Sequence, residues 1–301
     1  MELQSRADEI QGNGLGLVGI TYDSREILAG FSERNGITFP LLSDVGSATI
    51  RRYGILNTVA EEALGPNGSD PAVLADFERY VSVTSADERF RGIPYPGTFI
   101  VDPQGRVTAR EFEDYYWERN TVSSVMLALG AGAAPVQATQ VSTAHLDLSA
   151  YATDASVALG TRFSLAVDVT PKDGMHLYAP GATGYRVVSL NIAEEPHLRT
   201  EAAQYPASEI YYFAPLDERV PVFQQPFTLR VEAVAEATAA ARQAFAGRDE
   251  LAITGTLEYQ ACDDAICYNP VSVPLSWTVA LEGFVPGAPR PAPGPAPGPA
   301  Q

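Results

Sequence analysis

The two cysteines, Cys262 and Cys267, are separated by four residues, and no other cysteine occurs in the 301-residue chain. A disulfide scaffold uses more cysteines at longer range, and a zinc site needs two further ligands. The three histidines, His145, His176 and His197, form no ligand-like pair, so we expect no metal and no other cofactor. The spacing favours a redox-active dithiol/disulfide pair. A local structural staple, or two unpaired core residues, is the alternative.

The cysteines lie between two segments with strand patterns, residues 251–260 and 271–281. If these strands pair antiparallel, the cysteines flank the connecting loop, and their Cα atoms fall within the bridging range of about 4.4–6.8 Å. Such a small ring gains roughly 2 kcal/mol at most from loop closure. A short ring is also more readily reduced than a long-range staple, which favours a redox role.

Two carboxylates, Asp263 and Asp264, follow directly after Cys262. Negative charge beside a thiol disfavours the thiolate and raises the pKa of that thiol. We therefore expect the reduced pair to be a poor free nucleophile at neutral pH. Activation by a docked partner would suit a relay protein better than a broad reductant.

Residues 1–130 alternate strand and helix patterns, which predicts an α/β domain with an antiparallel hairpin near its end. The pair Asp23 and Ser24 is a good helix N-cap, and Gly36 is a good stop for that helix. Residues 57–90 interrupt the alternation and are interpreted as an insertion. The expected elements are buried strands at 15–20 and 96–101, shorter strands at 39–42 and 106–112, and helices at 47–53, 71–80 and 120–129.

Residues 131–143 are rich in Ala, Gly, Gln and Thr and are predicted to be a linker. From residue 144 to 283 the pattern changes to short alternating strands separated by turns, as in a β-sandwich. The expected strands are 162–169, 186–192, 227–235, 251–259 and 271–281, with one helical patch at 238–246. Residues 284–301 repeat Pro, Ala and Gly and are predicted to be a disordered tail.

The chain is acidic, with a net charge of −17 and a pI near 4.5. This charge argues against nucleic acid and anionic membrane surfaces as partners. No apolar run has the length of a transmembrane helix. Residues 1–10 are charged and helical in pattern, so we expect no signal peptide in the sequence as given.

Residues 259–270 have the sequence Tyr-Gln-Ala-Cys-Asp-Asp-Ala-Ile-Cys-Tyr-Asn-Pro, followed by a Val-Pro-Leu strand at 273–275. This motif resembles the N-terminal periplasmic domain of the thiol:disulfide interchange protein DsbD. Residues 173–178 and 205–211 resemble two further segments of that domain, the second of which carries its cap loop. The resemblance covers about residues 144–283.

This resemblance implies an immunoglobulin-like fold that passes electrons between a membrane-linked thioredoxin-like domain and periplasmic thiol proteins. By that resemblance, Cys267 would form mixed disulfides with partners and Cys262 would resolve them. Tyr205 would lie in or near a shielding cap loop, and Tyr268 beside the active site. Ordinary sandwich packing remains an alternative for these tyrosines and for Tyr178. His176 is interpreted as a half-buried strand residue.

Four further motifs, at residues 17–24, 39–44, 53–55 and 96–102, resemble the AhpC/TSA peroxiredoxin/redoxin branch of the thioredoxin fold. By this resemblance, Pro96 would be the cis-proline beside the active site. The arginine that many peroxiredoxins carry before this strand is absent. No cysteine precedes Cys262, so residues 1–130 cannot perform thiol peroxidase chemistry as written.

Three hypotheses follow. The first is a thiol–disulfide relay whose partners are thioredoxin-like or other thiol proteins, located in the periplasm or cell envelope by resemblance. The second is a peroxiredoxin-like antioxidant protein whose catalytic cysteine is missing because the sequence begins too late, since residues 1–11 resemble the tail of the family's catalytic helix. The third is a non-enzymatic adaptor that keeps both folds. Enzyme activity is therefore an open question at this point.

Overall fold

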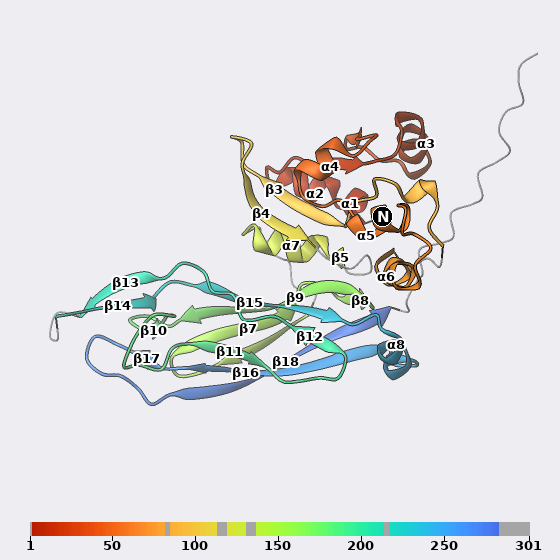
Figure 1. The fold of residues 1–301 in the computed structure, drawn as a ribbon. Coiled ribbons are helices and arrows are strands. Elements are labelled where there is room, and N and C mark those ends of the chain that lie inside the picture. The colour runs from red at the N-terminus through yellow and green to blue at the C-terminus, as the bar shows by residue number, and fades with distance from the viewer. Residues whose placement is uncertain (1, 82–84, 113–118, 131–136, 214–216, 283–301) are drawn as a thin grey trace, which may run out of the picture.

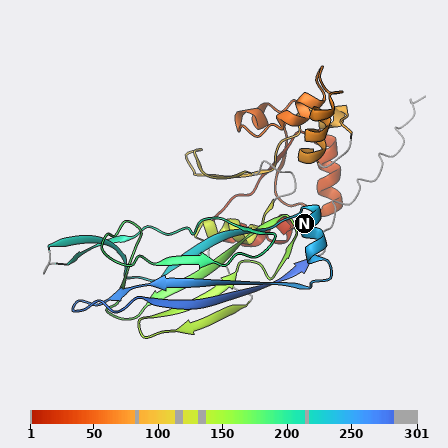
Figure 2. The same cartoon turned by 60° about the horizontal axis from the view of Figure 1, so that its bottom comes forward.

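The computed structural model describes residues 2–81, 85–112, 119–130, 137–213 and 217–282. A region of helices and short strands lies beside one long β-sandwich, as Figures 1 and 2 show from two directions. The predicted order, a redoxin-like α/β region followed by an immunoglobulin-like β-sandwich, is confirmed. In both views the β13–β14 hairpin (Glu209–Phe213 and Glu218–Phe223) lies at the end of the sandwich that is remote from helix α8 (Ala239–Phe245).

The first region contains helices with well-defined caps. Helix α3 begins after Ser24, whose Oγ accepts a hydrogen bond from Ile27 N, and ends at Gly36 with φ of 61°, as predicted. Its elements are α1 (Glu2–Ser5), α2 (Ala7–Gly12), β1 (Gly19–Thr21), α3 (Arg25–Asn35), β2 (Leu41–Ser43), α4 (Ala48–Arg52), α5 (Thr58–Ala63), α6 (Pro71–Val81), the 3₁₀ helix η1 (Glu88–Phe90), β3 (Gly97–Val101), β4 (Val107–Phe112), β5 (Arg119–Asn120) and α7 (Val122–Ala128).

Four strands of this region form two separate pairs, parallel β1–β2 and antiparallel β3–β4, whereas β5 pairs in parallel with β9 (Thr161–Pro171) of the sandwich. The prediction of buried strands at 15–20 and 96–101 is therefore wrong in part. Strand β1 has three residues, Ile20 is 42% exposed, and Val101 is 45% exposed. A two-stranded sheet has too few neighbours to cover both of its faces.

The predicted insertion has a small core of its own. Helix α6, expected at 71–80, is confirmed, and its Phe77 is fully buried in a cluster with Ala60 and Ile93. The ring of Phe90 meets Phe77 edge to face, with the centroids 5.4 Å apart. Helices α5 and α6 of this segment therefore pack against each other.

The sandwich packs a sheet of order β12-β15-β9-β7-β6 against a sheet of order β11-β16-β18-β8, and a third sheet, β13-β14-β10-β17, extends one end. Every other residue of β18 is buried, the period that a strand with one core face requires. The predicted strands and helical patch are found, with the one expected at 186–192 shortened to β11. The remaining bounds are β6 (Ala138–Ser142), β7 (Leu146–Ala152), β8 (Ser156–Ala158), β9 (Thr161–Pro171), β10 (His176–Tyr178), β11 (Ser189–Ile192), β12 (Leu198–Thr200), β15 (Phe227–Ala235), β16 (Glu250–Tyr259), β17 (Ala261–Cys262) and β18 (Val271–Glu282).

Part of the predicted linker is a strand of the sandwich. Strand β6 pairs antiparallel with β7 over five residues, and its alternating sequence lacks the strong apolar pattern that would have signalled it. Residues 131–136 and the predicted tail at 284–301 lie outside the described residues. The domain boundaries at 130 and 143 stay predictions.

Helix α7 contacts both regions. Its Val122 and Met126 pack in a cluster with Ile10 of α2. On another side, Ser124 Oγ lies 2.6 Å from Ser164 Oγ and donates to Glu232 Oε2 at 2.9 Å, so it is bonded to β9 and β15 of the sandwich. The helix predicted to close the first region therefore also rests on the second.

Candidate functional site

The two cysteines form a disulfide at one end of the longest strand pair. Strands β16 and β18 pair antiparallel over ten residues, as predicted, and the cysteines lie on either side of the loop that joins them. Cys262 and Cys267 are bonded, with their Cα atoms 4.1 Å apart. This separation is just below the expected range, because the two residues also face each other as an isolated β-bridge. No free cysteine remains.

Asp263 shapes the loop inside this ring. Its backbone N–H donates to Ile266 O at 3.0 Å, and its Oδ1 accepts from Ala265 N and Ile266 N at 2.8 Å each. Its Oδ2 accepts from the hydroxyl of Tyr268 at 2.8 Å. The backbone N–H groups of Ile266 and Ala265, then the Tyr268 hydroxyl, hold the pKa of Asp263 below its usual value. This carboxylate is therefore ionised beside the disulfide at neutral pH.

The two cysteine residues differ in exposure. Cys262 is 1% exposed and belongs to a buried cluster with Tyr178, Val220 and Val222. Cys267 is exposed, as is its neighbour Ile266. Cys267 is therefore the cysteine at the surface, and Cys262 is the one enclosed by the fold.

Tyr178 on β10 contacts both sulfurs. Its hydroxyl oxygen is 3.1 Å from Cys262 Sγ and 3.4 Å from Cys267 Sγ. The ring stacks on Tyr185 with the centroids 3.9 Å apart, and the Tyr185 hydroxyl donates to Glu218 Oε2 at 2.6 Å. Burial, and then the neighbouring Tyr185, raise the pKa of Tyr178, so its hydroxyl stays protonated and can donate to sulfur.

The β13–β14 hairpin covers the other side of the site. The hydroxyl of Tyr211 on β13 donates to Asp264 Oδ1 at 2.8 Å, and this hydrogen bond raises the pKa of Tyr211. The Tyr211 ring lies against His176, with the centroids 4.6 Å apart. His176 is 3% exposed and lies directly opposite Cys262 in the β10–β17 pairing. Three strands distant in sequence therefore converge on one disulfide.

The predicted site residues fall into two groups. Asp263, Asp264 and Tyr268 lie beside the disulfide through the contacts above. Tyr205 does not join them: it packs on the sandwich core, and its hydroxyl meets the backbone of Leu190. Tyr211, six residues further on, occupies the place over the site that the cap-loop resemblance suggested for Tyr205.

The predicted cis-proline is not found. No cis peptide bond occurs in the described part of the chain, so the Tyr95–Pro96 bond is trans. Trans is the lower-energy form by about 0.5–1 kcal/mol, and here Tyr95 N donates to Ile55 O at 2.7 Å in a local bridge that leads into β3. The cis assignment of Pro96 is corrected accordingly.

Sequence reasoning missed the contacts made by Tyr178, Tyr185, His176, Tyr211 and Glu218. One signal was available for two of them. His176 and Tyr178 are two residues apart on one strand, so their side chains share a face, and that strand precedes a turn rich in glycine. The other three come from loops and strands whose pairing the sequence pattern did not indicate.

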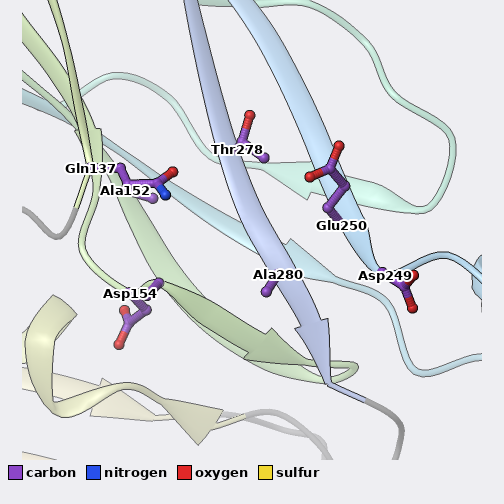
Figure 3. Close-up of a pocket in the computed structure, with 8 residues that line it drawn as sticks. Gln137, Ala152, Asp154, Asp249, Glu250, Thr278 and Ala280 are labelled. Carbon is purple, nitrogen blue, oxygen red and sulfur yellow. The ribbon is translucent and has the colours of Figure 1, made fainter.

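A hollow of about 160 Å³ lies at the opposite end of the β16–β18 pair and is lined by residues that include Asp154, Asp249 and Glu250. Figure 3 shows their carboxylates pointing in different directions, and Asp154 already accepts from Thr121 and Thr153. Within the described ranges no three His, Cys, Asp or Glu side chains come together as a metal site would require. Nor does any helix of that part of the chain have the length and hydropathy needed to cross a membrane.

The two regions match two families. The model of the AhpC/TSA family matches residues 1–110, and that of the N-terminal domain of thiol:disulfide interchange protein DsbD matches residues 147–274. Both predicted resemblances are confirmed: a redoxin-like region is followed by a DsbD N-terminal-like domain. No curated protein sequence matches the chain.

Two solved structures are similar to this chain. One is the N-terminal periplasmic domain of ScsB from Proteus mirabilis, with 14% identity over 45% of this chain and 49% of that chain and a TM-score of 0.32. The other is the DsbD N-terminal domain of Neisseria meningitidis in its reduced form, with 16% identity over 39% of this chain and 81% of that chain and a TM-score of 0.23. The match thus spans about half the length of the ScsB domain.

Proposed function

We propose that this protein performs thiol–disulfide exchange at Cys262 and Cys267 and relays electrons between thioredoxin-like thiol proteins. One observation carries the proposal: the disulfide joins an exposed residue, Cys267, to a buried one, Cys262, whose sulfur lies against a tyrosine hydroxyl. A staple with a purely structural role needs neither the exposure nor the donor. The family match over residues 147–274 supports the same chemistry.

The exchange begins at Cys267. A partner thiolate attacks the Sγ of Cys267, the more exposed cysteine, the Cys262–Cys267 bond breaks, and a partner–Cys267 disulfide forms. Cys262 leaves with the electron pair of the broken bond. A second thiol of the partner then attacks the partner's own sulfur in the mixed disulfide and releases Cys267. The partner dithiol is oxidised, and the cysteine pair gains two electrons and two protons.

Tyr178 assists the departure of Cys262. Its hydroxyl is 3.1 Å from the sulfur that becomes a thiolate, and a hydrogen bond to the charged form lowers the free energy of that form. Asp263 acts in the opposite direction, because a carboxylate beside the loop disfavours the thiolate. These opposing effects of the Tyr178 hydroxyl and the Asp263 carboxylate keep the reduced cysteines unreactive until a partner docks.

A cell-envelope location accords with this role. The similar ScsB domain is a periplasmic domain, and the other matching family is the N-terminal domain of a thiol:disulfide interchange protein. The redoxin-like region contributes no thiol of its own, since its sequence has no cysteine. Its contact with the sandwich through α7 supports the view that it holds or presents the exchange domain.

Trapping tests the proposal. The full chain carrying Cys262→Ser keeps a free Cys267, which should attack an oxidised thioredoxin-like protein and hold it as a mixed disulfide. The matched Cys267→Ser chain keeps only the buried thiol and should trap little or none. Non-reducing electrophoresis and mass spectrometry read the adduct. Equal trapping by both variants, or by neither, would contradict the proposal, and preferential trapping by Cys267→Ser would reverse the roles.

A further inference from the structure

We propose that His176 stabilises the thiolate of Cys262 by forming an imidazolium–thiolate pair with it when the disulfide opens. The inference rests on the exchange role proposed above and assigns one more residue to it. Neither the motif around the cysteines nor the family match points to this histidine.

Strand pairing brings the two side chains together. His176 and Cys262 are directly opposite in the antiparallel β10–β17 pair. Residues in such positions have Cβ atoms about 4.5–5.5 Å apart on the same face of the sheet. Both are nearly inaccessible, with 3% and 1% exposure, so charges that form here are poorly screened by water.

Aromatic neighbours fix the imidazole in this position. Its ring lies at 32° to Tyr211, with the centroids 4.6 Å apart, and nearly perpendicular to Tyr178 at 5.6 Å. The same Tyr178 hydroxyl touches Cys262 Sγ. The buried sulfur is therefore flanked by a hydroxyl donor and by an imidazole that is held in place.

The surrounding charges explain why a cation is needed. Asp263 and Asp264 follow Cys262 in sequence, Tyr211 faces the histidine from β13, Tyr178 shares its strand, and Glu218 of β14 lies behind Tyr185. All the ionisable neighbours are acids, and each ionised carboxylate disfavours a thiolate in the same pocket. A protonated His176 directly opposite Cys262 offsets that repulsion.

The proton comes from solvent. Burial lowers the pKa of His176, and the nearby Asp264 and Asp263 only partly oppose this, so the imidazole is neutral beside the disulfide at neutral pH. When the sulfur–sulfur bond breaks, the new charge on Cys262 favours uptake of one proton by His176. In the reverse direction, Cys262 attacks the mixed disulfide, its charge disappears, and His176 releases the proton.

Histidine titration by NMR in the oxidised and reduced full-length chain reads this coupling directly. The chain has three histidines, and His197, paired with Glu236 far from the disulfide, is an internal control. Reduction should raise the pKa of His176 by about one unit or more, a tenfold change in its protonated fraction, and leave His197 unchanged. An unchanged His176 would overturn the inference.

A series of variants measures the effect of His176 on the pKa of the Cys262 thiol. In the Cys267→Ser chain, Cys262 is the only thiol, and its thiolate absorbs in the ultraviolet. Adding His176→Phe keeps an aromatic ring and should raise the apparent pKa of Cys262, slowing its alkylation at neutral pH roughly tenfold. His176→Gln should behave similarly, and His197→Asn, which tolerates the left-handed backbone at that residue, should have no effect.

Equal thiolate titrations with and without His176 would contradict the proposed pair. These outcomes are separable from failure of the exchange function. The titrations need no partner protein, so a shifted Cys262 with no trapped adduct would leave the His176 pairing intact and remove the relay. A trapped adduct with no shift would do the reverse.

Discussion

The two regions of this molecule differ in the length of their strands. In the redoxin-like region β1 and β2 have three residues each, and apolar side chains such as Ile20 and Leu42 remain 42% and 49% exposed. In the sandwich, β16 and β18 have ten and twelve residues, and their inward side chains are buried in one continuous core. The cysteine pair lies at the end of this rigid hairpin, so the scaffold determines the geometry of the disulfide.

The chemistry divides in the same way. The sandwich surrounds its disulfide with tyrosine hydroxyls, carboxylates and a buried histidine from several strands and loops. The redoxin-like region keeps the α3 caps and the β3–β4 turn of its fold, yet its sequence has no thiol. The fold alone does not identify the reaction, so function has to be argued from the site.

We expect the largest effect on thiol exchange from a substitution in the sandwich, and almost none from a substitution in the redoxin-like region. Cys267→Ser should abolish reduction of the chain by a thioredoxin-like dithiol, because the remaining Cys262 has no partner cysteine and there is no disulfide to reduce. Asp102→Asn, in the β3–β4 turn of the redoxin-like region, should leave the rate within about twofold. Stopped-flow kinetics measures the rate of thiol exchange for the two variants and the unmodified chain. A large loss in Asp102→Asn would show that the first region takes part in the reaction.

Truncating an apolar side chain should lower the free energy of unfolding more in the sandwich than in the redoxin-like region. Phe163 on β9 is fully buried, and Phe163→Ala should cost about 3–5 kcal/mol of unfolding free energy. Ile20→Ala on the half-exposed β1 should cost about 1 kcal/mol or less. Denaturant unfolding with the disulfide intact measures both. Similar losses at the two positions would contradict the contrast in packing.

The contact between the regions should have an intermediate effect. Ser124→Ala removes the hydroxyl that contacts Ser164 and donates to Glu232, two buried partners on the sandwich, and should cost about 1–3 kcal/mol. Amide hydrogen exchange should accelerate in α7 and not in β16. Unchanged protection of α7 would mean that this helix is held by the redoxin-like region alone.

The smallest expected effect is pH dependent. Hydrogen bonds hold the pKa of Asp263 below its unfolded value of about 3.9, so its contribution to stability is present above that pH and is lost as pH falls through the folded pKa. Asp263→Asn should therefore lower Tm at pH 7, and the difference from the unmodified chain should shrink as pH falls from 7 through the folded pKa of Asp263. If the difference in Tm between the variant and the unmodified chain does not change with pH, the ionised carboxylate of Asp263 does not stabilise the fold.

Sequence patterns predicted the sandwich well, because alternation over long strands such as residues 227–235 is a strong signal. The Cys loop could be placed because both flanking strands were visible in the sequence. The surroundings of the disulfide could not, since Tyr178, Tyr185 and Tyr211 come together only through the pairing of β10, β14 and β13. The strand at 15–20 was predicted as buried because an apolar run does not reveal whether neighbouring strands cover it.

Redox equilibration of the full-length chain tests the central claim most directly. The chain is incubated with a thioredoxin-like protein at a series of dithiol-to-disulfide ratios, and the free thiols of Cys262 and Cys267 are counted by alkylation and mass. The account predicts one reversible two-electron transition in which both thiols appear and disappear together under native conditions. Cysteines that stay bonded in excess dithiol, or that stay free under oxidising conditions, would contradict it.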